Sequence, residues 1–71
     1  MSEPEARRLS ELDEARGLLE SVSCLDGVAV ARFGWGSVAF PEELEPELAG
    51  GVGHEIAILR LDGRYHLRTL S

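Results

Sequence analysis

The chain has 71 residues, a single cysteine and a formal net charge of −6 at pH 7. A chain of this length forms one small domain with a thin stability margin, and a lone cysteine with two histidines excludes an internal disulfide and leaves few ligands for a structural metal. The acidic balance argues against nucleic acid as a partner, because non-specific binding of nucleic acid comes from neutralising phosphates.

Two further features of the composition concern origin and location. Lysine, asparagine and glutamine are absent, a bias typical of either a thermophile or a GC-rich genome. The N-terminal residues alternate charges and do not resemble a signal peptide. The longest apolar run, Val28 to Ala31, is far shorter than the roughly 20 residues that span a bilayer. We therefore expect a cytoplasmic protein with no membrane partner.

Residues 3–22 are predicted to form a helix. Ser2 followed by Glu5 matches a capping box, in which each side chain bonds a backbone donor of the first turn. Gly17 lowers the helix preference by about 1 kcal/mol relative to alanine, so the helix is expected to need a sheet to pack against. Four apolar residues recur at spacings of three to seven, with Ala15 between them, and define one helix face: Leu9, Leu12, Leu19 and Val22.

Residues 28–40 are predicted to form a hairpin around Gly34-Trp35-Gly36. A three-residue loop would separate the strand residues into two apolar faces, one with Val28, Val30, Val38 and Phe40 and the other with Ala29, Ala31, Phe33 and Ala39. A sheet that is apolar on both sides is expected to be covered on both. The first helix would cover one side and a partner chain the other.

A short helical turn is predicted over residues 41–49. Pro41 suits the first helical position, Pro46 prevents a long helix, and Gly50-Gly51 ends it. The acidic residues of this turn lack the spacing of a calcium loop and are interpreted as a solvated surface. The Gly-Val-Gly segment before His54 lacks the pattern of a phosphate-binding loop and is interpreted as a connector.

Residues 54–70 are predicted to form a second hairpin, because Asp62-Gly63 lies between two strand-like runs. Two registers are open: a two-residue loop pairs Leu61 with Arg64, and a three-residue loop pairs Arg60 with Arg64. The second register is preferred because it separates two faces more cleanly. One face then holds Ala57, Leu59, Leu61, Tyr65 and Leu67, and the other holds Ile56, Ile58, Arg60, Arg64, His66 and Arg68.

These patterns provide the candidate binding residues. Arg60, Arg64, His66 and Arg68 would form one basic face that suits a carboxylate- or phosphate-bearing partner, or simply a solvated strand face that keeps a sheet edge soluble. Trp35 would be either an exposed binding anchor or a ring folded back over the core. Cys24 is interpreted as a small buried apolar residue. We predict no catalytic, metal-binding or cofactor-binding residues.

The segment of residues 15–40, with Leu25-Asp26-Gly27-Val28 between the predicted helix and hairpin, resembles the roadblock/LC7 family and related profilin-like modules. This resemblance implies a helix that leads through a Gly-Val step into a hairpin, and an adaptor that forms dimers. It implies no functional residues for this chain.

Together the patterns predict a single α+β domain in which an N-terminal helix packs on an antiparallel sheet of about four strands, in the order α-β-β-α-β-β. The leading functional hypothesis is a non-enzymatic interaction or regulatory protein that forms a homodimer and binds an acidic protein partner. The alternative is a small ligand- or nucleic-acid-binding module that uses the arginine-rich C-terminal hairpin.

Overall fold

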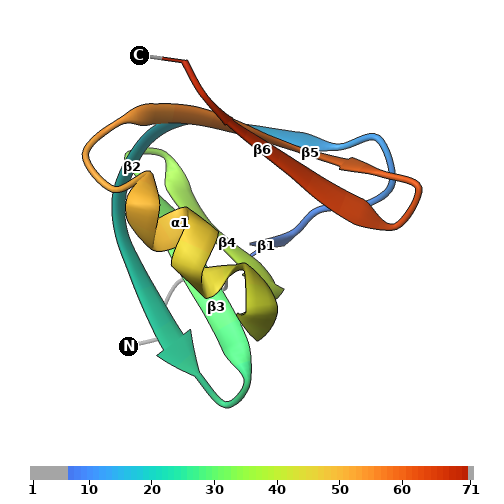
Figure 1. Ribbon diagram of the computed structural model, residues 1–71, viewed down its shortest axis with the longest axis horizontal. Helices are drawn as coiled ribbons and strands as arrows, with labels where there is room; N and C mark the ends of the chain where they lie inside the picture. The colour runs from blue at the N-terminus through green and yellow to red at the C-terminus, as the bar shows by residue number, and fades with distance from the viewer. Residues whose placement is uncertain (1–6, 71) are drawn as a thin grey trace.

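The computed structural model describes residues 7–70, which form a curled six-stranded sheet with one short helical segment. The strand order is β1-β4-β3-β2-β5-β6, and the sheet bends into a half-barrel (Figure 1). The β1–β4 pair is parallel, and the other pairs are antiparallel. The elements are β1 Arg7–Arg8, β2 Glu14–Leu25, β3 Val28–Phe33, β4 Gly36–Pro41, the 3-10 turn η1 Glu42–Leu44, α1 Glu45–Gly50, β5 Glu55–Leu61 and β6 Arg64–Thr69.

The predicted α+β fold with an N-terminal helix is wrong, because residues 14–25 form the longest strand of the sheet. The first half of β2 pairs with β5 and the second half with β3. An extended β2 therefore forms hydrogen bonds with backbone groups of both neighbouring strands. A helix at this position would leave those backbone groups without partners. Six strands are present where about four were expected.

A bulge in β2 explains why its sequence imitates a helix. Leu19 pairs with Phe33, but the next pair is Ser21 with Arg32, so Glu20 is an extra residue. An extra residue shifts the inward positions by one. Ala15 and Leu19 face the core before the bulge, and Val22 packs against it afterwards. The resulting spacings of four and three are those of a helix face.

The chain also turns before β2, which interrupts the predicted helix a second time. The Asp13 N–H donates to the Ser10 carbonyl (2.9 Å), and the Ser10 N–H donates to the Asp13 carboxylate (2.9 Å). Leu12 takes a positive φ of 70° in this turn. The capping residues Ser2 and Glu5 lie outside the described residues. Without a helix before the Gly27-Val28 step, the resemblance to roadblock/LC7 modules fails.

The first hairpin has a two-residue loop, Gly34-Trp35, so its predicted three-residue register is wrong. In the observed register, the large aromatic and aliphatic core residues of the hairpin lie on one side of the sheet. The predicted register would have divided these residues between the two sides. The residues that face the core are Ala29, Ala31, Phe33, Val38 and Phe40, and those on the outer face are Val28, Val30, Arg32, Ser37 and Ala39.

The second hairpin also has a two-residue loop, so the preferred register, with Arg60 opposite Arg64, is wrong. Leu61 pairs with Arg64 and Arg60 with Tyr65. Asp62 and Gly63 both have positive φ, 55° and 71°. This is the type I′ geometry that matches the twist of the flanking strands. Turn geometry thus decides the register over apolar segregation, and it leaves Leu59 and Leu61 on the outer face.

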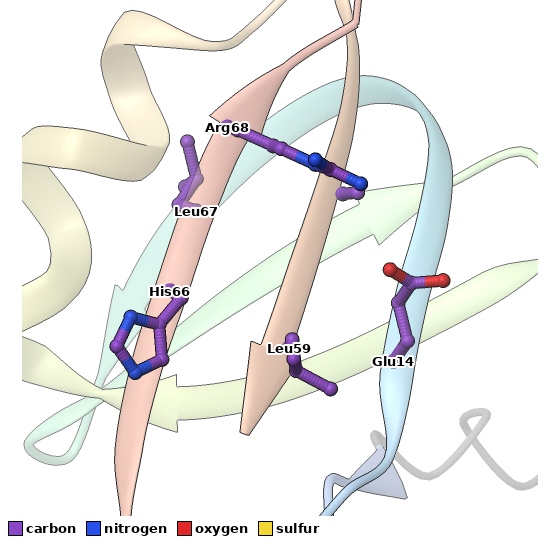
Figure 2. A pocket seen from close by; sticks show the side chains of 6 residues that line it. Glu14, Leu59, His66, Leu67 and Arg68 are labelled. Atoms are coloured by element: carbon purple, nitrogen blue, oxygen red, sulfur yellow. The ribbon is translucent and has the colours of Figure 1, made fainter. Parts of the chain in front are cut away.

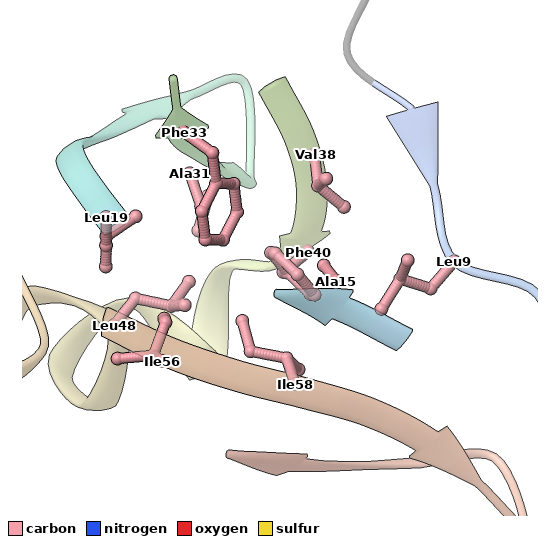
Figure 3. Close-up of a cluster of buried hydrophobic side chains, with 11 residues drawn as sticks. Leu9, Ala15, Leu19, Ala31, Phe33, Val38, Phe40, Leu48, Ile56 and Ile58 are labelled. Carbon is pink, nitrogen blue, oxygen red and sulfur yellow. The ribbon is translucent and has the colours of Figure 1, made fainter. Parts of the chain in front are cut away.

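The core lies inside the curl of the sheet (Figure 3). Leu48 projects into it from α1 and is completely buried, which contributes about 1.5–3 kcal/mol. The largest fully buried side chains come from five elements: Phe33, Leu19, Leu48, Ile56, Ile58 and Val38. Within residues 7–70, no helix is long and apolar enough to cross a membrane.

Candidate functional site

The outer face of β5 and β6 carries three of the four predicted basic residues. Arg64, His66 and Arg68 pair with Leu61, Leu59 and Ala57, respectively, and share their face of the sheet. All three are exposed. We refer to Arg64, His66 and Arg68 as the basic stripe.

A shallow pocket of about 240 Å³ lies beside this stripe (Figure 2). Arg68 extends from β6 across β5 towards Glu14 of β2 (Figure 2). Ala57 is on the outer face but only 3% exposed, which agrees with the long arginine stem lying over it. The pocket is lined by Glu14, Ala57, Leu59, His66, Leu67 and Arg68.

Exposed apolar side chains lie on the same face as the basic stripe. Leu18 of β2 is 53% exposed and Leu61 of β5 is 37% exposed. Leu59, half-buried, lies between Glu14 and His66 in one row across the sheet. Cationic and aliphatic groups therefore alternate over the β5–β6 part of this surface, and Glu14 and Glu55 add carboxylates to it.

The outer edge of β6 is open in the described part of the chain, because β6 is the last strand of the sheet. The Leu70 N–H donates to the Glu55 carbonyl (2.7 Å). Hydrogen-bonded and non-bonded positions alternate in an antiparallel pair, so the backbones of Tyr65, Leu67 and Thr69 point away from β5. The open backbone edge and the basic stripe thus both belong to β6.

Arg60 is separated from the other three basic residues, which corrects the prediction of a single basic face. It lies on the core side of β5, half-buried. Its Nη1 donates to the Leu9 carbonyl (2.8 Å), and its guanidinium carbon is 5.7 Å from the centre of the Tyr65 ring. Tyr65 in turn meets Phe40 edge to face, with ring centres 5.4 Å apart.

Arg60 lines a second pocket, of about 340 Å³, on that side of the sheet. Sequence reasoning missed this pocket, because Arg8, Phe40 and Tyr65 lie far apart in the chain and no short motif connects them. Its lining residues are Arg8, Gly27, Val28, Ala39, Phe40, Pro41, Arg60 and Tyr65.

Trp35 is folded back over the core and is also half-exposed. Its ring stacks on Phe33 with centres 4.9 Å apart and planes within 4°, and its Nε1–H donates to the Arg16 carbonyl (2.9 Å). The side chain still exposes 50% of its surface. The ring therefore covers the core at the end of the first hairpin and leaves one side accessible.

Cys24 is exposed, so its predicted burial is wrong. It lies near the end of β2, opposite Ala29 of β3. Partial desolvation raises the pKa of the thiol, and the nearby carboxylates of Glu45 and Glu42 raise it further. Because the thiolate is the nucleophile, a raised pKa opposes nucleophilic use of this cysteine.

The described residues contain no group of three or more His, Cys, Asp or Glu side chains placed to hold a metal ion. Comparison with protein family models, curated proteins and solved structures gives no match for this chain.

Proposed function

We propose that this protein is a non-enzymatic interaction module that binds an acidic, extended segment of a partner protein along β6. The observation that supports this proposal is the basic stripe: Arg64, His66 and Arg68 project from one face of a strand whose backbone edge is open. An added strand would gain main-chain hydrogen bonds from the edge and specificity from side-chain pairing.

The charge of the stripe favours an acidic partner strand over a second copy of β6. Two antiparallel β6 strands centred on His66 would place Arg64 opposite Arg68 on the same face. Centring the pair on Leu67 would place His66 opposite Arg68. Like charges directly opposite one another destabilise a strand pair, and edge charges commonly prevent self-pairing. Glutamate or aspartate at these positions would give favourable pairs.

The apolar part of the surface suits the alternate residues of such a segment. Leu18, Leu59 and Leu61 offer aliphatic contacts between the cationic groups. A partner with alternating acidic and aliphatic residues would match both kinds of contact. Carboxylates at the rim would mainly raise the association rate, and burial of the aliphatic groups would slow dissociation.

The test uses a short synthetic peptide that alternates glutamate and valine, titrated into the ¹⁵N-labelled protein. We expect saturable shifts of the β6 amides, with an affinity that falls as salt is raised. Arg64→Glu should weaken binding about tenfold or more, since it replaces an attractive contact with a repulsive one.

Two controls distinguish the proposal from non-specific attraction. Arg7→Glu makes the same charge change on β1, at the opposite edge of the sheet from β6, and should leave the affinity within about twofold. A peptide that alternates lysine and valine should not bind. Equal binding of both peptides, or an affinity unaffected by Arg64→Glu, would contradict the proposal.

We also propose that the protein forms a homodimer through the outer face of β3 and β4. Val28 and Val30 lie half-buried on this face, and the neighbouring Leu25 is 68% exposed. Val28 stands at the end of the face, where it also lines the second pocket. These apolar side chains stay partly or largely exposed on that face. Self-association would remove them from water.

A further inference from the structure

The second pocket lies where the half-barrel fails to close. β1 covers the edge of β4 at Val38 and Ala39 only, so the edge beyond, at Phe40 and Pro41, carries no strand. Across this gap stand Arg60 and Tyr65 of the β5–β6 hairpin, and the Phe40–Tyr65 ring contact bridges it. The pocket therefore lies between β4 and the β5–β6 hairpin, which contact each other at this place through side chains.

Arg60 is held in place before any ligand arrives. The Leu9 carbonyl accepts from its Nη1, and the Tyr65 ring lies beneath its guanidinium. A guanidinium has five N–H donors, and within residues 7–70 its Nε is buried without an acceptor. A buried donor without a partner costs about 1–3 kcal/mol, so the Arg60 guanidinium keeps an unused capacity to donate to a further acceptor.

The charge around the pocket is positive, in contrast to the protein as a whole. Arg8 and Arg60 both line it, and no acidic side chain of residues 7–70 does. In the same part of the chain neither arginine forms an ion pair with a carboxylate. The carboxylate of Glu11 lies near Arg60. It already accepts hydrogen bonds from the Asp62 and Gly63 amides. Within the described residues, the two guanidinium groups therefore have no carboxylate partner.

The remaining wall of the pocket is apolar and of limited size. Val28, Pro41 and Tyr65 provide flat or aliphatic surface next to the arginines. A volume of about 340 Å³ is at the small end of the range for ligand pockets, which runs from about 300 to 1,000 Å³. A single ring with one acidic group matches this volume and this division between charge and apolar surface.

We propose that this pocket binds a small aromatic acid, with its phosphate or carboxylate between Arg8 and Arg60 and its ring against Val28, Pro41 and Tyr65. Guanidinium groups bind both kinds of anion through paired N–H donors. This site lies on the core side of the β5–β6 hairpin, whereas the basic stripe occupies the outer side. The two sites can therefore be tested independently.

The test titrates phenyl phosphate, benzoate, inorganic phosphate and benzyl alcohol into the full-length ¹⁵N-labelled protein. We expect saturable shifts of the Arg60 Nε–H and of the Gly27 and Tyr65 amides with phenyl phosphate or benzoate. The tighter of these two identifies the acidic group that the site prefers. Benzyl alcohol lacks the charge and inorganic phosphate lacks the ring, so each should bind about tenfold more weakly or not at all.

Variants assign the binding to this pocket. Arg8→Glu should weaken the preferred acid about tenfold or more, and Arg8 is exposed on a two-residue strand, so the fold should persist. Arg60→Lys keeps the charge but loses the planar fork, and should also weaken binding. Arg64→Glu, on the outer face, should leave this affinity within about twofold while it weakens the acidic peptide.

Three results would overturn the proposal. The first is equal binding of benzyl alcohol and the acids. The second is an unchanged affinity in a folded Arg8→Glu protein, with folding checked by circular dichroism. The third is a set of shifts confined to Arg64, His66 and Arg68, which would place the acids on the basic stripe instead.

Discussion

Gly17 and Trp35 depend on each other at the point where β2 bends. Gly17 has a φ of +153°, and a Cβ at this position would lie 2.9 Å from the Trp35 Nε1. The indole occupies the space above the glycine, stacks on Phe33 and bonds the Arg16 carbonyl. The residue that weakened the predicted helix is therefore the one that lets the tryptophan cover the core.

We predict that Gly17→Ala destabilises the protein by about 1–3 kcal/mol, because the methyl group displaces the indole and the backbone conformation is unfavourable for alanine. Urea unfolding measures the change in free energy, and a red shift of the tryptophan fluorescence reports the displaced ring. Gly34→Ala is the matched control, since its Cβ would meet nothing nearer than a Glu20 oxygen at 3.7 Å.

A double-mutant cycle separates the two causes. In a Trp35→Ala background, Gly17→Ala should cost less, and the difference measures the steric conflict between the two side chains. Equal costs in both backgrounds would mean that the indole is not displaced and that backbone conformation alone is responsible.

At the scale of elements, Glu11 connects the start of the chain to the turn of the second hairpin. Its carboxylate accepts hydrogen bonds from the Asp62 and Gly63 amides, 51 and 52 residues away. These bonds, the Gly63 one first, lower the pKa of Glu11 below its ordinary value of 4.5, and the charge of Arg60 adds to the effect. The type I′ turn is thus held from outside as well as by its own geometry.

We predict that Glu11→Gln makes the protein less stable at neutral pH and less sensitive to acid. A carboxyl whose pKa is lower when folded contributes stability above its unfolded pKa, and loses it as pH falls through the folded pKa. The native protein should therefore lose this contribution below about pH 4.5, whereas the glutamine variant should show a flatter profile there. Urea unfolding between about pH 7 and about pH 3 measures both.

Glu47→Gln on the exposed surface of α1 removes a carboxylate of the same type from a position without these amide contacts, and should keep the native profile. If Glu11→Gln and the native protein lost stability in parallel as pH falls, the carboxylate would not be stabilising the turn.

The elements show which parts of the fold a sequence can predict. Asp62-Gly63 located the second hairpin, because both positive φ angles suit these two residues. The register failed because apolar segregation was given more weight than turn geometry. The helix failed because the bulge at Glu20 gave a strand the spacings of a helix face. No local pattern could reveal that β2 pairs with strands on both sides.

The candidate site was predictable only in part for the same reason. Arg64, His66 and Arg68 share a face because they alternate on one strand, which the sequence displays directly. The separation of Arg60 from them depends on the register, and its pocket depends on Arg8, which lies 52 positions earlier in the chain. Such contacts arise from the curl of the whole sheet.

At the scale of the molecule, the half-barrel has two outer surfaces of different character. The surface of β2, β5 and β6 carries the basic stripe, two glutamates and exposed leucines, whereas the surface of β3 and β4 carries Val28 and Val30. A chain of this size has a thin stability margin, so burial of the second surface against another copy would add stability. The two proposed interfaces lie on different strands, so self-association through one would leave the other open.

We predict that the protein is a dimer at micromolar concentration and that Val30→Asp converts it to a monomer, because a carboxylate in an apolar interface would lose its hydration. Sedimentation equilibrium measures the mass of each protein. Leu61→Asp introduces the same charge on the basic outer surface and should leave the dimer intact. A compact monomer in the native protein, or loss of the dimer with Leu61→Asp but not with Val30→Asp, would show that β3 and β4 do not form the interface.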